Sequence, residues 1–328
     1  MLTTNFIYTG YKEFTKNGYL KASQKFKDLP KSYARNVLIT GSNSGIGLAT
    51  AKLLYEKGAH VHLACRNEER AENARKEILD SCSSQGQVSV HKLDISDLKS
   101  IKPFITNLKS TQPNLNFTAL VNNAGCMVHG TDPKKRILQS NNYEINCATN
   151  SLGTYLLTDQ FLKNYSSSLK KVVTVSSGGM YTKKLEPNLG FDKNWGNFPK
   201  DATGLYASNK RQQVVFMEEL AKIHSKPSSS NPIFFATMHP GWADTAAVRT
   251  AMPDFYERFQ GNWRTPEMGA DTIVYLLVEE QKMSESGKFW LDREIKPTKL
   301  TFDFSWGSDD GDRKVLMKNY EKVVKEFC

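Results

Sequence analysis

Residues 36–47 read Asn-Val-Leu-Ile-Thr-Gly-Ser-Asn-Ser-Gly-Ile-Gly, an apolar run that stops at a glycine-rich turn. The run 37–39 is short and β-branched, as expected of a buried parallel strand, and the apolar residues after Gly47 have helical spacing. One glycine can make the tight turn, a second lets the backbone approach a phosphate, and a third allows close packing of helix on strand. Because the free N–H groups at a helix N-terminus attract anions, the stretch indicates a dinucleotide-binding site.

The spacing of this turn is Gly-x-x-x-Gly-x-Gly, which by itself also fits a purely structural strand-turn-helix. If the turn binds a cofactor, we expect contacts to the phosphates from Gly41, Asn43, Ser44, Gly45, Ile46 and Gly47. Residues elsewhere in the chain are needed to distinguish these two interpretations.

The chain has 328 residues and no Pro/Gly/Ser-rich linker, so we expect one domain with an extension at each end. We place a basic and aromatic extension at residues 1–34, the domain at 35–292 and a C-terminal extension with a terminal helix at 293–328. No apolar run is long enough to span a membrane, and no signal-peptide core is expected. The five cysteines are scattered, which favours reduced thiols and a cytoplasmic location.

The net charge of +10 comes mainly from lysines spread along the chain, six of them in residues 1–34. No basic patch is interleaved with stacking aromatic residues, so an anionic cofactor and a solvated surface are expected rather than a nucleic acid partner. His60 and His62 share one strand face without a Cys, Asp or Glu neighbour, so no metal site is predicted.

The N-terminal extension alternates basic and aromatic residues, and Ile7, Tyr11 and Phe14 would share one helical face. Packing of this arm on the domain is favoured, because acids are present and lysine replaces the arginine usual in transit peptides. The alternative is a peripheral membrane contact through the arm.

From residue 36 onward, strand and helix patterns alternate, which predicts a single Rossmann-like, doubly wound parallel sheet with helices on both faces. We expect about seven strands, at residues 37–39, 59–65, 88–93, 117–121, 171–175, 232–238 and 288–291. Long helices are predicted at 140–162, 205–224 and 266–280, and Asn67 and Ser96 are expected to cap helices. The segment 180–203, rich in Pro and aromatic residues, is predicted to form a lid or rim.

Ligands of an open α/β sheet bind outside the carboxyl ends of its strands. Unusual residues follow the predicted strands repeatedly, at Gly41, Arg66, Asp94, Asn123, Ser177 and Gly241. The carboxyl ends of parallel strands meet at one edge, so we expect these residues to surround one site.

A carbonyl that accepts hydride from a nicotinamide becomes an alkoxide, so the site needs a proton donor and hydrogen bonds to that oxygen. Tyr206 can supply the proton, but its ordinary pKa of about 10 would have to fall by about 3, which takes about 4 kcal/mol. Lys210 lies on the same helical face, and a charge about 4 Å away at an effective dielectric of about 20 supplies that amount. An isolated Tyr-x-x-x-Lys is more often a surface pair, whereas Ser177 at a strand end favours catalysis.

Cofactor preference depends on the residue after the second strand, where an acid would bind the ribose 2′-hydroxyl of NAD. Cys65-Arg66 offers no acid there, and an arginine can pair with the 2′-phosphate of NADP. We therefore predict NADP(H), against the alternative that Arg66 is a solvated residue at a helix start.

Five motifs occur in order along the chain: Thr40-Gly41-x-x-x-Gly45-Ile46-Gly47, Asn122-Asn123-Ala124-Gly125, Ser177, Tyr206-x-x-x-Lys210 and Pro240-Gly241. With these motifs the sequence resembles the short-chain dehydrogenase/reductase family over roughly residues 36–292. The resemblance selects Ser177 over Ser176 as the residue that hydrogen-bonds the substrate oxygen. It also implies that Asn150 holds a water linking Lys210 to solvent, although Asn146 is a nearby competitor.

The resemblance further implies where the cofactor would lie, with Asp94 at the adenine and Asn123 on the sheet side. Tyr206 and Lys210 would contact it as well, and the nicotinamide end would meet Pro240, Gly241 and Thr245. Many members of the family dimerise through the helices that here contain Asn150 and Tyr206, so a homodimer is implied unless the terminal extensions cover that surface.

We therefore predict an NADP(H)-dependent oxidoreductase that interconverts a carbonyl and an alcohol, a small-molecule substrate. The gap from Ser177 to Tyr206 is similar to that in retinol-dehydrogenase-like members. Together with Trp242, Met127 and Met180, the aromatic 180–203 segment predicts an apolar pocket for a lipophilic substrate. The alternative is a catalytically silent NADP(H)-binding sensor or scaffold.

Overall fold

The structure is a computed structural model that describes residues 4–130, 138, 142–191, 201–226, 228–300 and 308–328. The strands are β1 (Asn36–Thr40), β2 (His60–Cys65), β3 (Gln87–Lys92), β4 (Ala119–Asn122), β5 (Lys171–Val175), β6 (Phe234–Met238), β7 (Lys288–Leu291) and β8 (Glu294–Lys296). They form one sheet in the order β3-β2-β1-β4-β5-β6-β7-β8. Every neighbouring pair is parallel except β7 and β8.

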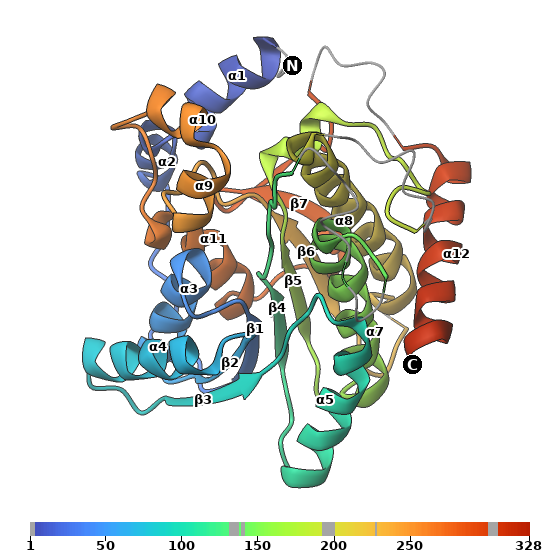
Figure 1. Ribbon diagram of the computed structural model, residues 1–328. Coiled ribbons are helices and arrows are strands. Elements are labelled where there is room, and N and C mark those ends of the chain that lie inside the picture. Colours follow the sequence, from blue (N-terminus) through green and yellow to red (C-terminus); the bar gives the residue numbers. More distant parts are fainter. Residues whose placement is uncertain (1–3, 131–137, 139–141, 192–200, 227, 301–307) are drawn as a thin grey trace.

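The sheet lies between two layers of helices (Figure 1). One layer contains α3 (Gly45–Glu56), α4 (Glu68–Ser81) and α11 (Pro266–Val278). The other contains α5 (Leu98–Thr111), α6 (Ile145–Cys147), α7 (Thr154–Asn164), α8 (Ala202–His224) and α12 (Asp310–Phe327). Each layer buries its own apolar core against the sheet, because the central strands are buried on both faces.

The predicted doubly wound sheet is confirmed, and the fifth and seventh strands have the predicted bounds. The additional strand, β8, follows a turn in which Asp292 and Arg293 have φ values of +53° and +60°. This turn folds β8 back as an antiparallel edge on β7.

Three local expectations differ from the structure. Asn142 has a φ of +63°, which a helix cannot contain, so the predicted 140–162 helix begins only at Ile145, beyond residues 139–141 that lie outside the described part. The helical run continues through a π-helical segment, Ala148–Gly153, into α7. Asn67 caps α4 as predicted, but Ser96 instead donates to the Asp94 carboxylate, and Asp97 is the residue before α5.

The segment predicted as a lid or rim is partly buried where the structure describes it. A short 3₁₀ turn, Gly178–Thr182, places Met180 and Tyr181 in an apolar cluster, and Leu185 is buried as well. The residues 192–200, which include two aromatic residues of that prediction, lie outside the described part.

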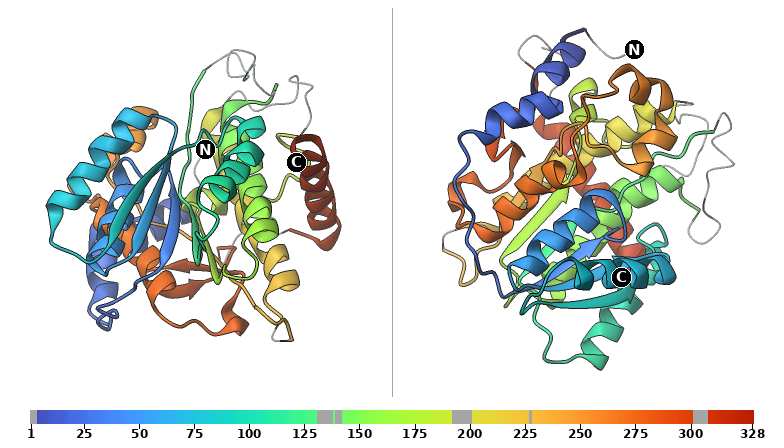
Figure 2. Two further views of the ribbon diagram at one scale, coloured as in Figure 1. Left: turned by 90° about the horizontal axis from the view of Figure 1, so that it is seen from below. Right: turned by 90° about the vertical axis from the view of Figure 1, so that its left-hand side faces the viewer.

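The N-terminal arm, which we define as Thr4–Ser23, packs on the domain beside the segment 246–265 (Figure 2). It consists of α1 (Thr4–Thr9), a π-helical turn (Gly10–Phe14) and α2 (Lys16–Ser23). The neighbouring segment contains two short helices, α9 (Ala246–Ala251) and α10 (Pro253–Arg258). The predicted packing of the arm is therefore found, whereas the domain boundaries and the membrane contact stay predictions.

At the other end of the chain, α12 packs against α5, α7 and α8. The ring of Tyr320 stacks on Tyr155 at 4.1 Å, and its hydroxyl lies 2.6 Å from the Ser151 hydroxyl. The C-terminal extension thus covers the helices through which a homodimer was predicted. Within the described residues, no helix combines the length and the apolar character that crossing a membrane requires.

Candidate active site

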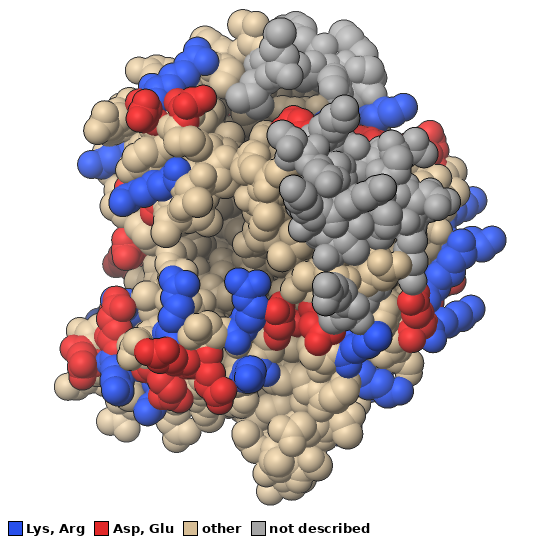
Figure 3. All heavy atoms as spheres, viewed as in Figure 1, with Lys and Arg blue, Asp and Glu red and all other residues tan. Residues whose placement is uncertain are grey.

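A cavity of about 590 Å³ opens at the carboxyl edge of the central strands. Figure 3 shows the hollow, with Lys and Arg side chains gathered along its lower rim. The cavity is lined by all the residues predicted to bind the cofactor, namely Gly41, Asn43, Ser44, Gly45, Ile46, Gly47, Arg66, Asp94, Asn123, Tyr206, Lys210, Pro240, Gly241 and Thr245. Ser177 lines it too, so the predicted site residues meet in one place, with the exception of Asn150.

The glycine-rich turn needs its glycines for two different reasons. Gly41 and Gly45 have φ values of +62° and +56°, a conformation that side chains disfavour. Gly47 has ordinary backbone geometry, but a Cβ there would lie 2.4 Å from the Asn123 amide nitrogen and 2.6 Å from the Gly41 carbonyl. The turn therefore brings bare backbone to the cavity at the start of α3.

Asn123 fixes the other side of this turn. Its amide nitrogen donates to the carbonyls of Thr40 and Gly41 at 2.9 and 3.1 Å, and its backbone N–H donates to the Thr40 hydroxyl. These bonds tie the end of β4 to the end of β1. The side chain thus shapes the cavity floor rather than reaching across it.

The basic end of the cavity carries Arg66 and, in addition, Arg70. The Arg66 guanidinium is largely exposed and lies 4.0 Å from the Asp94 carboxylate. Asp94 is itself held by the Ser96 backbone N–H and hydroxyl. Arg70 was missed because the third residue of a helix, here α4, carries no signal of its own.

Next to the end of the central strand β5, α8 places Tyr206 and Lys210 on one helical face, with Ser177 beside the tyrosine. The Lys210 ammonium lies 5.3 Å from the centre of the Tyr206 ring and donates to the Val175 carbonyl at 2.8 Å. The side chain of Lys210 is buried, whereas Tyr206 is partly exposed to the cavity.

Burial governs the protonation of both groups. It raises the pKa of Tyr206 to about 12, although hydrogen bonding from the Ser177 side chain lowers it. Burial also lowers the pKa of Lys210 to about 7. Burial is the largest cause of both shifts, because removal from water disfavours the charged form of each group, and the expectation that Lys210 lowers the pKa of Tyr206 stays a prediction.

Asn150 lies behind the cavity wall and is fully buried. Its side-chain oxygen accepts from the Cys126 N–H at 2.9 Å and its amide donates to the Cys126 carbonyl at 2.8 Å. A Cβ on Gly125 would lie 3.1 Å from the Asn150 side-chain oxygen and 3.5 Å from the Lys210 nitrogen, so only Gly125 separates the two. Its competitor Asn146 binds the Val128 backbone instead. The role of Asn150 stays a prediction.

The loop after β6 closes the site from the side opposite the glycine turn. Gly45 faces Thr245, since a Cβ on Gly45 would lie 3.2 Å from the Thr245 methyl group. Gly241 has a φ of +73°, and a Cβ there would lie 2.2 Å from the Arg264 side chain. The loop thus permits only glycine at the position that the sequence predicted to contact the nicotinamide.

The far end of the cavity is apolar. It is lined by Phe6, Met127, Val128, Trp242, Val248, Ala251, Met252, Phe255 and Trp263. Trp242 and Met127 were predicted there, but Met180 is fully buried in the cluster beneath and does not line the cavity. Among the described residues, the apolar wall includes side chains of α9, α10 and the N-terminal arm, while Thr182 and Thr203 of the 180–203 segment line the cavity as well. The helical spacing of residues 248, 252, 255 and 259 was the signal that could have revealed it.

A Rossmann-type sheet with a glycine turn at β1 and a Ser, Tyr and Lys group at the same edge defines a nucleotide-binding oxidoreductase class. Residues 35–185 match the profile of the short chain dehydrogenase family. The chain is 39% identical to human dehydrogenase/reductase SDR family member 12 over 97% of this chain and 96% of the relative. It is 32% identical to human retinol dehydrogenase 11, covering 79% of this chain and 77% of that one.

Two solved structures share the fold at lower identity. A short chain dehydrogenase from Burkholderia cenocepacia in complex with NADP is 19% identical, with a TM-score of 0.58 over 80% of this chain and 96% of that chain. A 3-ketoacyl-(acyl-carrier-protein) reductase from Brucella melitensis complexed with NADH is 21% identical, with a TM-score of 0.58 over 78% and 95%. The protein belongs to the short-chain dehydrogenase/reductase family of oxidoreductases.

Proposed function

We propose that this protein is an NADP(H)-dependent oxidoreductase that interconverts a carbonyl and an alcohol on a lipophilic small molecule. The observation that carries the proposal is the continuity of one cavity. The glycine turn lies at one end, Ser177 and Tyr206 lie in the middle, and an apolar wall lies at the other end. Retinol dehydrogenase 11, by its name, acts on a lipophilic alcohol, which agrees with that wall.

The residues present fit a dinucleotide. Gly45 faces Thr245 across the cavity, and Gly41 and Gly47 allow the turn to pack closely on Ala124 and Asn123. The start of α3 offers free N–H groups to a pyrophosphate. No acid follows β2, where Arg66 stands at the cavity rim beside Arg70. Two guanidinium groups at this place favour the 2′-phosphate of NADP over the 2′-hydroxyl of NAD.

In the mechanism, the bound cofactor supplies or accepts the hydride, and the protein handles the proton. Ser177 would donate a hydrogen bond to the substrate oxygen, which orients it toward Tyr206. Because burial raises the pKa of Tyr206 to about 12, this hydroxyl is protonated at neutral pH and ready to donate to a developing alkoxide. The protonation state of the protein by itself therefore suits carbonyl reduction.

Lys210 is the residue that would stabilise the deprotonated form of Tyr206. With its pKa near 7, it gains a proton easily at neutral pH and can then stabilise the tyrosinate left after proton donation. Its bond to the Val175 carbonyl holds the ammonium beside the ring.

The test combines binding and turnover. NADPH and NADH are titrated separately while protein fluorescence is followed, since Trp242 and Trp263 both line the cavity. We expect NADPH to bind far more tightly than NADH. Binding of neither would contradict the proposed cofactor site.

Replacement Tyr206→Phe removes the proton donor and separates an enzyme from a silent sensor or scaffold. We expect a loss of turnover of at least about 100-fold, the usual contribution of general acid catalysis, with NADPH binding retained. The matched control is Tyr165→Phe, because that buried hydroxyl has no hydrogen-bond partner in the described part of the chain. Equal activity of Tyr206→Phe and wild type would exclude the assigned mechanism.

A further inference from the structure

The N-terminal arm reaches the apolar end of the cavity directly. Phe6 lines the cavity and is 4% exposed, whereas Tyr8, two residues further on the same helix, is 69% exposed. The two aromatic side chains of α1 therefore point in opposite directions, one toward the site and one toward solvent.

A second contact joins the arm to the tryptophan of the cavity wall. A Cβ on Gly10 would lie 2.2 Å from a ring atom of Trp242, so the arm backbone lies flat against that ring. The Trp242 backbone N–H donates to the Phe14 carbonyl at 2.7 Å. Trp242 is thus held between the arm and the cavity.

A third contact leads toward the serine of the site. The ring of Phe14 meets His239 edge-on, with 4.5 Å between ring centres. The His239 nitrogens have no hydrogen-bond partner among the described residues, and a Cβ on Gly178 would lie 2.8 Å from one of them. Phe14 therefore presses on the histidine that supports the turn after Ser177.

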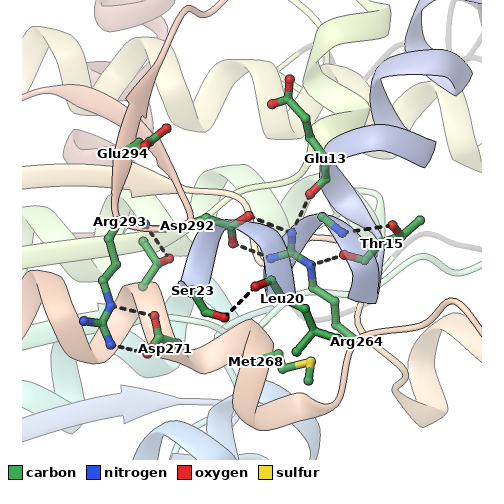
Figure 4. A network of polar contacts seen from close by, with 12 residues as sticks. Glu13, Thr15, Leu20, Ser23, Arg264, Met268, Asp271, Asp292, Arg293 and Glu294 are labelled. Atoms are coloured by element: carbon green, nitrogen blue, oxygen red, sulfur yellow. Dashed lines mark hydrogen bonds and ion pairs between the residues drawn. The ribbon is translucent and has the colours of Figure 1, made fainter. Parts of the chain in front are cut away.

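A buried ion pair anchors the arm in this position (Figure 4). The Arg264 guanidinium forms a two-pronged pair with Asp292 at 2.5 and 2.8 Å. The same guanidinium donates to the backbone carbonyls of Glu13 at 2.6 Å and Thr15 at 3.2 Å. Since Gly241 packs on this side chain, the anchor connects the arm to the loop after β6.

We propose that the N-terminal arm is part of the substrate site, in which Phe6 and Trp242 receive the hydrocarbon portion of the substrate and set its preferred length. This inference rests on the proposed function and deepens it. A hydrocarbon chain or ring fits here because the lining beyond Ser177 is apolar and aromatic, and because the arm closes that end with another phenyl ring.

The test compares straight-chain aldehydes of increasing length, from butanal to dodecanal, with NADPH as the reductant. In the wild type we expect kcat/KM to rise with chain length. In Phe6→Ala we expect the ratio of dodecanal to butanal to fall about tenfold, through KM, because a phenyl ring that contacts only the longer chain is lost. The NADPH dissociation constant stays unchanged, so the change in the length profile comes from the substrate.

The matched control is Tyr8→Ala, which removes an exposed aromatic ring from the same helix and should leave the length profile unchanged. Phe6→Leu provides a second variant with a smaller change, and its melting temperature is compared with that of the wild type to exclude unfolding. An unchanged length profile in a folded Phe6 variant would overturn the inference.

A measurement without turnover separates this inference from the proposed function. Binding of 1-dodecanol is followed through the fluorescence of the cavity tryptophans, with and without the Phe6→Ala replacement. Weaker binding by about tenfold supports the arm as a substrate wall, even if no aldehyde is reduced and the proposed reaction fails. Equal binding by both proteins, or none by the wild type, overturns it.

Discussion

Removal of the Arg264 side chain should be the most damaging single change to the anchor of the N-terminal arm. The side chains of Arg264 and Asp292 are only 1% and 7% exposed, and the guanidinium also satisfies two backbone carbonyls of the arm. Arg264→Met keeps most of the length and apolar volume of the arginine but leaves a carboxylate buried without its cation.

The magnitude follows from this burial. Removing one partner of a buried ion pair costs about 3–5 kcal/mol, because the charge left behind is poorly solvated. Each buried carbonyl without a donor adds about 1–3 kcal/mol, although water reaching a loosened arm reduces that part. We therefore expect Arg264→Met to lower the free energy of unfolding by about 4 kcal/mol.

A second replacement tests the cause. Asp292→Asn added to Arg264→Met removes the stranded charge, and asparagine tolerates the φ of +53° at this position better than other neutral residues do. The double variant should recover more than half of the loss. The part of the lost stability that the double variant does not recover reports the cost of leaving the Glu13 and Thr15 carbonyls without their donor.

The assay is equilibrium unfolding in urea, in which a shift of the midpoint at constant slope reports a change in stability. Limited trypsin digestion of the folded proteins reports on the arm, because Lys12 and Lys16 are exposed on it. We expect cleavage to be faster in both Arg264 variants. The control is Arg249→Met, since Arg249 makes an equally two-pronged pair with Asp244 but is 58% exposed. It should show no resolvable loss of stability.

The reasoning would be refuted if Arg264→Met and Arg249→Met had the same small effect. It would also be refuted if the double variant were less stable than Arg264→Met alone. Either result would mean that the Asp292 charge is not costly when its partner is absent.

Two further predictions concern charge. Burial lowers the pKa of His62 to about 2 and of His91 to about 4, so below pH 6.5 the unfolded chain binds more protons than the folded one. The free energy of unfolding should therefore fall as the pH drops from about 6.5, by up to about 1.4 kcal/mol per pH unit for each histidine. Urea unfolding at about pH 7 and about pH 5 measures this fall, and equal stability at the two pH values would contradict the prediction. Arg66→Ala should weaken NADPH binding about tenfold and leave NADH binding nearly unchanged, whereas Arg75→Ala, which removes a surface pair with Glu72, should change neither titration.

The sheet could be predicted because short stretches of sequence are enough to identify its strands. Each central strand is a short apolar run followed by a residue unsuited to a strand, as Gly41 follows β1. Alternation of these runs with helices implies parallel pairing. The strand β8 could not be predicted in this way. It has only three residues, two of them charged, and it exists because the turn at Asp292 and Arg293 directs it onto β7.

The site residues likewise fall into those that local sequence patterns predict and those that they do not. Residues such as Gly41 and Asn123 follow strand ends, so parallel order alone brings them to one edge. Phe6 and Arg264 follow no such rule, because the contacts of the arm join segments about 250 residues apart. Nothing in the local pattern of either segment indicates the other, and only the folded chain shows that the arm closes the cavity.

The protonation of the site is a further property that residue identity cannot supply. The sequence places Tyr206 and Lys210 on one helical face, and a charge at that distance is large enough to favour tyrosinate. Burial acts against this effect, because it raises the pKa of Tyr206 to about 12 and lowers that of Lys210 to about 7. How far Lys210 lowers the pKa of Tyr206 therefore depends on which ligand occupies the cavity. A bound group that keeps Lys210 protonated would lower the pKa of Tyr206, whereas an apolar group alone would raise it further. A pH profile of turnover should consequently report both groups, with the tyrosine appearing at a lower pKa in the complex than in the protein by itself.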